Sequence, residues 1–212
     1  MQPGYWRCGV SLMRFGEKYL GNIGLLTGML IMLAAPTPLA AQVPATTESL
    51  VNQLAGLETT PDLNVAALRQ QALERVKSKV DAAPLKRPPV VVQILKLPQM
   101  NAEVQFDSDS PIIRPQSYRA IGRIADALYH PKLLPYGFLI VANTDSTGKR
   151  EYNLTLSQRR ADAIREVLVT TFKISPKRLQ ALGLGEEQLQ DAAHPTAASN
   201  LRIQIITVAK IP

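Results

Sequence analysis

The hydrophobic and polar positions become regular in the second half of the chain, where alternating runs point to strands and helical spacing points to helices. Apolar residues fall at every second position in some stretches, and they recur on one helical face in others. The pattern predicts strands at 102–106, 137–142, 179–185 and 201–208, and helices at 116–130 and 153–171. This order predicts an α/β (α+β) sandwich, β-α-β-α-β-β, with two helices packed on one side of a mixed parallel and antiparallel sheet. A right-handed crossover makes the first two strands parallel.

The chain before residue 98 is less regular. Residues 45–58 and 61–80 have helical patterns, and Pro61 suits a first helical turn. The second of these helices is expected to be a solvated spacer, or alternatively to dock on a partner or on the domain. Prolines 84, 88, 89 and 98 interrupt the following stretch, in which residues 90–95 (VVVQIL) are compatible with one strand. We therefore expect a helical spacer and proline-rich linker at 42–98, and a domain at 99–210 that folds alone.

The N-terminus has the order of regions found in export signals. Basic residues come first, the apolar and uncharged run IGLLTGMLIMLAA follows at 23–35, and small residues end at Ala41. We expect a signal peptide at 1–41 and a mature chain that begins at Gln42. The apolar run is shorter than the roughly 20 residues that span a membrane. It comes close when counted from residue 20 to 41, so an uncleaved inner-membrane anchor remains the alternative. Either outcome places the rest of the chain in the periplasm or cell envelope.

Composition narrows the classes of partner. Lys and Arg outnumber Asp and Glu by 24 to 17, which favours anionic surfaces. The basic residues are scattered, aromatic residues make up only 5%, and no nucleic-acid motif is present, so nucleic acid is not an expected partner. Cys8 is the one cysteine and precedes the apolar run. A disulfide framework, a cysteine metal site and a lipidation cysteine after the signal are therefore excluded. No cofactor or metal is expected.

The sequence also argues against an enzyme. His130 and His194 are the two histidines, and each precedes a proline, as turn histidines often do. No nucleophile elbow, phosphate-binding glycine loop or metal-spaced cluster occurs. Asp107 and Asp109 in FDSDSP suggest a carboxylate pair or a calcium loop, but the spacing and closing glutamate of an EF-hand are missing. That stretch is better interpreted as a polar turn before the first helix.

One candidate site comes from helical counting in the segment 153–171. Arg160 lies in the middle of an apolar stripe, and Asn153 lies on the same side two turns earlier. A guanidinium that faces the sheet needs a partner, because an unpaired buried charge is costly. Asp145 follows a buried strand, a place where α/β folds commonly bind ligands. The two residues together suit a zwitterion, with Arg160 on a carboxylate and Asp145 on an ammonium. The alternative is an internal clasp in which they pair with each other.

Four motifs occur in order along the second half of the chain: TD-x-x-G at 144–148, N-x-x-LS-x-x-RA at 153–161, G-x-GE at 183–186 and N-x-R at 200–202. Over about residues 100 to 210 the chain resembles the peptidoglycan-associating C-terminal domain shared by OmpA, the Pal lipoprotein and the MotB stator protein. The resemblance implies noncovalent, non-catalytic binding of peptidoglycan in a Gram-negative envelope, with an outer-membrane-associated protein as one expectation. A possible envelope protein partner goes with this interpretation.

The resemblance also implies which residues bind. The family's loop aspartate and helix arginine hold the diaminopimelate of the stem peptide, and they correspond to Asp145 and Arg160. The other expected ligand-binding residues are Asn143, Thr144, Asn153 and Arg202. The family usually has Gly-His where this chain has Ala142 and Asn143, and an arginine where it has Leu201; the added methyl of Ala142 is expected to narrow the pocket floor. These departures leave one alternative, a periplasmic protein-interaction module whose cell-wall pocket is vestigial.

Overall fold

The computed structural model describes residues 46–78, 83–84 and 87–211 of the chain. The predicted signal peptide or anchor at 1–41 lies outside the described residues. Residues Val43–Pro212 group into one unit by their internal contacts. None of the helices in the described ranges is long and apolar enough to cross a membrane.

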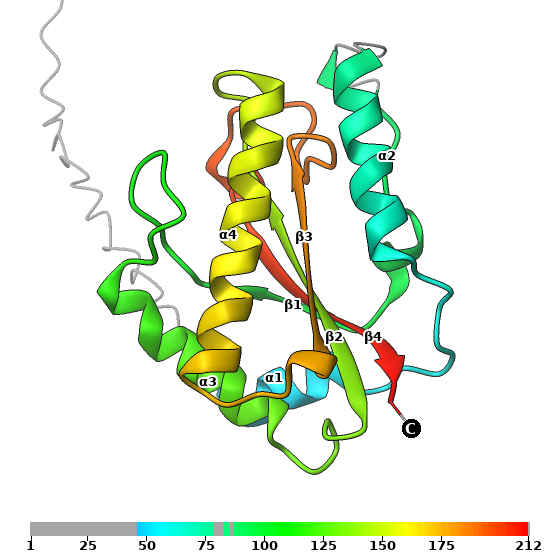
Figure 1. Cartoon of the computed structure of the whole chain (residues 1–212), viewed down its shortest axis with the longest axis vertical. Coiled ribbons are helices and arrows are strands. Elements are labelled where there is room, and N and C mark those ends of the chain that lie inside the picture. The colour runs from blue at the N-terminus through cyan, green and yellow to red at the C-terminus, as the bar shows by residue number, and fades with distance from the viewer. Residues whose placement is uncertain (1–45, 79–82, 85–86, 212) are drawn as a thin grey trace, which may run out of the picture. The chain divides into compact units, whose positions relative to one another are not determined.

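The sheet has four strands in the order β1-β4-β2-β3. They are β1 (Gln99–Ala102), β2 (Tyr136–Asn143), β3 (Leu179–Gly185) and β4 (Ile203–Lys210). β2 pairs with β3 in parallel and with β4 in antiparallel, and β1 pairs with β4 in antiparallel. The sheet is therefore mixed, as the sequence predicts (Figure 1). β1 and β2 run in the same direction, but β4 lies between them.

The strand β2 is apolar from residue 138 to 142, because both of its faces are covered. Phe138 and Ile140 belong to the core on one face, which includes buried residues of α1 (Thr47–Leu54), α3 (Tyr118–Leu128) and α4 (Arg150–Thr170). Leu139 and Val141 belong to the core on the other face, with residues of α2 (Val65–Ser78). The two predicted domain helices are confirmed as α3 and α4. The sequence did not predict that α2 and residues 90–94 of the N-terminal half pack on the second face of the sheet.

The prediction of a solvated spacer helix was wrong. Ala72 and Val76 of α2 are buried in the second core, and Arg69 donates from Nη2 to the carbonyl oxygen of Ala181 in β3 at 2.8 Å. The helix begins at Val65 rather than near Pro61, because the Asn64 side chain accepts the N–H of Ala67 and caps it there. The alternative given for this helix, docking on the domain, is what the structure has. Whether residues 99–210 fold alone stays a prediction.

Two strand predictions near the start of the domain were also wrong. Residues 90–95 form no strand. Val91 and Ile94 insert into the second core, and a short 3₁₀ helix, η2, spans Gln93–Lys96. The strand predicted at 102–106 lies instead at 99–102, where it pairs with β4; Phe106 forms only an isolated bridge with Ile113. An alternating pattern specifies which side chains share a face of the sheet. The register of pairing with the neighbouring strand decides at which residue the strand ends.

Two glycines allow α4 to lie very close to β3, the strand at the outer edge of the sheet. A Cβ atom on Gly183 would lie 2.1 Å from the backbone nitrogen of Gln158, and one on Gly185 would lie 2.8 Å from that of Leu154. The glycine N–H groups donate to the Gln158 and Ser157 side chains of α4, each at 2.8 Å. Edge strands need such cover. This close approach brings the first turns of α4 beside the carboxyl ends of β2 and β3, where the candidate site forms.

Candidate ligand-binding site

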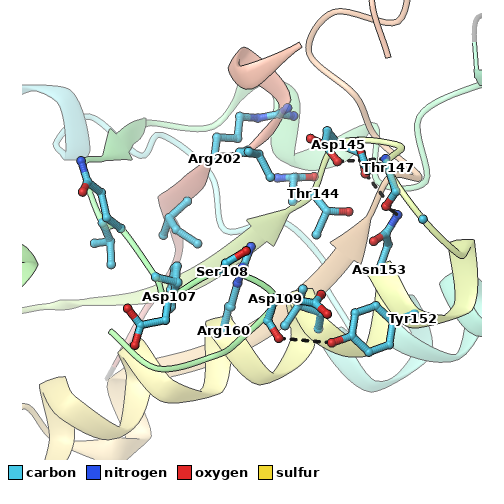
Figure 2. A pocket seen from close by; sticks show the side chains of 18 of the residues that line it. Asp107, Ser108, Asp109, Thr144, Asp145, Thr147, Tyr152, Asn153, Arg160 and Arg202 are labelled. Atoms are coloured by element: carbon cyan, nitrogen blue, oxygen red, sulfur yellow. Dashed lines mark hydrogen bonds between the residues drawn. The ribbon is translucent and has the colours of Figure 1, made fainter. Parts of the chain in front are cut away.

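A cavity of about 930 Å³ opens at the carboxyl end of β2, between the start of α4 and the chain around residues 104–109. All of the residues predicted to bind ligand line it, namely Asn143, Thr144, Asp145, Asn153, Arg160 and Arg202. They come from the end of β2, the loop after it, α4 and the residue directly before β4, and Figure 2 labels all of them except Asn143. The fold thus brings together residues that span nearly 60 positions of the chain.

Arg160 enters the cavity without a carboxylate partner. Its Nε donates to the carbonyl oxygen of Ser110 at 3.0 Å, and its guanidinium carbon lies 4.9 Å from the centroid of the Phe106 ring. Burial lowers the pKa of Arg160, while the nearby Asp109 acts in the opposite direction. Among the described residues no carboxylate forms an ion pair with Arg160, and its two Nη groups donate to no protein acceptor. The internal clasp with Asp145 is therefore not formed.

Asp145 lies in a loop that is held from several sides. Its Oδ1 atom accepts the N–H of Thr147 at 2.9 Å. The Nδ2 atom of Asn153 donates to the carbonyl oxygens of Asp145 and Thr147, at 3.2 and 3.1 Å, and to Oε2 of Glu186 at 2.8 Å. An amide nitrogen has two hydrogens for these three acceptors, so one hydrogen is shared. The loop is fixed while the carboxylate of Asp145 remains partly exposed.

Three buried polar atoms around the cavity have no hydrogen-bond partner among the described residues: Asn143 Oδ1, Thr144 Oγ1 and Arg202 Nη1. Arg202 does donate from Nη2 to the carbonyl oxygen of Gln188 at 2.8 Å, and burial lowers its pKa. In the described part of the chain, every buried side-chain polar atom without a partner belongs to a residue of this cavity. Buried polar groups in proteins are normally paired, so a cluster of unpaired ones indicates a place for a polar ligand or ordered water.

Sequence reasoning missed one wall of the cavity. The segment FDSDSP does turn, since Asp109 has a φ of 54°, but it also lines the cavity together with Tyr152. The Tyr152 hydroxyl donates to the carbonyl oxygen of Asp109 at 3.3 Å (Figure 2), and Nε of Arg160 donates to the carbonyl oxygen of Ser110. Tyr152 directly precedes the motif residue Asn153, which is the only signal in the sequence that pointed to it.

Comparison with known proteins assigns the family. Residues 105–202 match the OmpA family. These residues form a domain of the OmpA family. The chain is 31% identical to outer membrane porin F of Pseudomonas fluorescens over 113 residues, which are 52% of this chain and 34% of that protein. It is 36% identical to the peptidoglycan-associated lipoprotein of Pseudomonas putida over 83 residues, 39% of this chain and 48% of that protein. The chain thus spans about a third to a half of the length of these relatives.

Among solved structures, the peptidoglycan-associated lipoprotein from Burkholderia pseudomallei is 30% identical, with a TM-score of 0.40. The match covers 51% of this chain and 87% of that one. The structure also places Ala142 and Leu201, two positions at which the sequence was expected to depart from the family pattern. The side chain of Ala142 is buried in the first core and does not line the cavity, so the expectation that it narrows the pocket floor was wrong. Leu201 lines the cavity and is 49% exposed.

Proposed function

We propose that the OmpA-family domain binds peptidoglycan noncovalently through the diaminopimelate of its stem peptide, and so attaches an envelope protein to the cell wall. The observation that carries the proposal is the single cavity that offers an unpaired guanidinium, a partly exposed carboxylate and a cluster of unpartnered polar atoms. Diaminopimelate has ammonium and carboxylate groups on one short carbon chain, and these groups complement such a cavity. The name of the peptidoglycan-associated lipoproteins among the relatives supports the same class of ligand.

Each charged group has a role in the proposed complex. The Nε atom of Arg160 is occupied by Ser110, which leaves the two Nη groups to hold a carboxylate with two parallel hydrogen bonds. Because the guanidinium of Arg160 lies over the Phe106 ring, its orientation is already restricted, and the side chain loses less conformational freedom when the ligand binds. Asp145 receives the ammonium. Asn143, Thr144 and Arg202 offer hydrogen bonds to the remaining polar atoms of the ligand, and Asn153 holds the loop in place.

The proposed role is binding without catalysis. Of the described residues that line the cavity, none is a histidine or a cysteine. Nor do three or more His, Cys, Asp or Glu side chains of the described ranges gather where they could hold a metal ion. We place the domain in the periplasm, with the segment at 1–41 acting as a signal peptide or as an inner-membrane anchor. The outer-membrane names of relatives support an envelope location.

The test is retention of the full chain on purified sacculi. We expect it to sediment with diaminopimelate-type sacculi and not with lysine-type sacculi, which lack the second carboxylate. Asp145→Asn and Arg160→Ala should each abolish retention. Arg178→Ala is the matched control, since Arg178 bonds the carbonyl oxygens of Leu128, Leu133 and Tyr136 outside the cavity. Retention that survives both pocket substitutions would favour the partner-binding module instead.

A further inference from the structure

A buried cluster of four charged side chains lies beside the cavity. Its members, here called the charge cluster, are Arg87, Arg150, Glu186 and Glu187. Arg150 holds Glu187 with two hydrogen bonds, from Nε at 2.5 Å and from Nη2 at 2.6 Å, and this bonding raises the pKa of Arg150. Arg87 Nη1 lies 2.9 Å from Glu186 Oε1 and 3.6 Å from Glu187 Oε1. The four side chains are between 0% and 13% exposed.

The charge cluster is electrically balanced, with two cations and two anions, and its parts come from three places in the chain. Glu186 and Glu187 follow β3, Arg150 begins α4, and Arg87 belongs to the segment before the domain. Arg87 lies outside residues 105–202, the range that matches the OmpA family. The segment has a second attachment four residues later, where the N–H of Val91 donates to Oε1 of Gln188 at 3.0 Å.

Glu186 connects this charge cluster to the ligand cavity. One of its carboxylate oxygens accepts from Arg87, and the other accepts from Nδ2 of Asn153 at 2.8 Å. That same nitrogen donates to the backbone oxygens of Asp145 and Thr147. Arg87 therefore orients the Glu186 carboxylate. That carboxylate in turn orients the side-chain amide of Asn153, which holds the loop that carries Asp145. Asn153 is 4% exposed, so water has little access to replace a lost acceptor.

We propose that Arg87 is a positioning residue for the ligand cavity, so that the segment ahead of the OmpA-family domain sets the affinity of the site. Without Arg87, Glu186 keeps an unbalanced negative charge in a buried place, and its carboxylate turns toward solvent or toward Arg150. Asn153 then loses a fixed acceptor, and the loop that carries Asp145 becomes looser. Displacing residues 87–91 from the domain would weaken ligand binding through the same contacts. The affinity part of this inference rests on the proposed function.

The experiment uses the full chain with Arg87→Gln, which removes the charge and keeps much of the side-chain length. Amide hydrogen exchange at Ser146 and Thr147 reports on the loop directly, and titration with meso-diaminopimelate reports on affinity. We expect exchange at these two amides to rise about fivefold or more, as for a locally loosened segment. We expect affinity to fall about tenfold, as happens when a supporting partner of a metal ligand is removed. Arg87→Lys, which restores the charge, should recover most of both losses.

The matched controls are Arg178→Ala and Arg69→Ala. Both remove a guanidinium that bonds backbone carbonyls, and Arg69 belongs to the same N-terminal half as Arg87. At temperatures where all variants are folded by near-ultraviolet circular dichroism, these two should leave loop exchange and affinity unchanged. If Arg87→Gln gives no folded protein, Glu186→Gln replaces it, because it disturbs the same connection from the other side.

The outcomes separate this inference from the proposed function. Unchanged loop exchange in Arg87→Gln, or in its replacement Glu186→Gln, would overturn the positioning role whatever the ligand is. An equal rise in exchange in Arg178→Ala would also overturn it, because the effect would then reflect general stability. Loosened exchange in a chain whose unmodified form does not bind meso-diaminopimelate would support the positioning role and contradict the proposed function. Loosened exchange together with weaker binding supports both.

Discussion

The charge cluster and the ligand cavity are two polar regions that meet at Asn153, and they differ in how their polar groups are satisfied. In the charge cluster each of the four charged side chains has an opposite charge within 3.6 Å. Among the described residues, Arg160 of the cavity has no carboxylate partner, and three buried polar atoms have no hydrogen-bond partner. The difference teaches that internally paired groups hold this fold together, whereas unpaired groups are available to a ligand.

The largest expected effect comes from removing the N-terminal half. A fragment of residues 99–212 loses Arg87 from the charge cluster and uncovers apolar side chains of the second core, including Leu139 and Val141. We still expect a cooperative urea transition, because the sheet, α3 and α4 all lie in the fragment. Its free energy of unfolding should be lower than that of residues 43–212 by about 5 kcal/mol or more, since each buried aliphatic side chain contributes about 1.5–3 kcal/mol. Equal stability would show that α2 contributes nothing to the domain.

A single substitution in the charge cluster should have the next largest effect. Glu187→Gln removes a carboxylate whose side chain is fully buried. Glu186 then remains as the one anion of the charge cluster beside two cations, Arg87 and Arg150. Breaking a buried ion pair from one side costs about 3–5 kcal/mol, because the remaining charge stays desolvated. Urea unfolding of the full chain measures this cost. A loss below about 1 kcal/mol would mean that the charge cluster is hydrated like a surface pair.

The matching substitution in the cavity should change stability much less. Asp145→Asn keeps an oxygen that accepts the N–H of Thr147, and the Asp145 side chain is partly exposed and forms no ion pair with the described residues. We expect the free energy of unfolding to change by about 1 kcal/mol or less, as for surface charges, while retention on diaminopimelate-type sacculi is lost. A stability loss as large as that of Glu187→Gln would remove the contrast between the two regions.

The smallest expected effect has the opposite sign. Thr144→Val replaces a buried hydroxyl, which has no hydrogen-bond partner in the described part of the chain, with a methyl group of similar size. Because an unsatisfied buried hydroxyl is unfavourable, stability should stay equal or rise by about 1 kcal/mol. Affinity for meso-diaminopimelate should fall, since the ligand loses a hydrogen bond. Urea unfolding of the variant measures its stability, and calorimetric titration of the same protein measures its affinity. A clear loss of stability would indicate that an ordered water, rather than a ligand, satisfies this hydroxyl.

The sequence predicted the second half of the domain well. The helices at Tyr118–Leu128 and Arg150–Thr170 and the strands at Tyr136–Asn143 and Leu179–Gly185 lie close to their predicted ranges. In those segments hydrophobic periodicity is strong because each element buries one face or both. The last strand begins two residues later than predicted, after the short 3₁₀ turn Ala198–Asn200. Asp145 and Arg160 were singled out as candidates from their positions, in a polar loop after a buried strand and within an apolar stripe, and the family resemblance favoured a ligand over an internal clasp.

By itself, the sequence therefore determined the order of elements in the domain, the family of residues 105–202, and the residues that line one wall of the cavity. Only the tertiary structure decided which polar groups are paired. The contact between Arg87 and Glu186 joins residues 99 positions apart, and that of Arg160 with Ser110 joins residues 50 apart. Local periodicity carries no information about such partners. Their pairing depends on how helices and loops pack over the sheet, because a buried charge is compensated by whatever group the packing brings within a few ångströms.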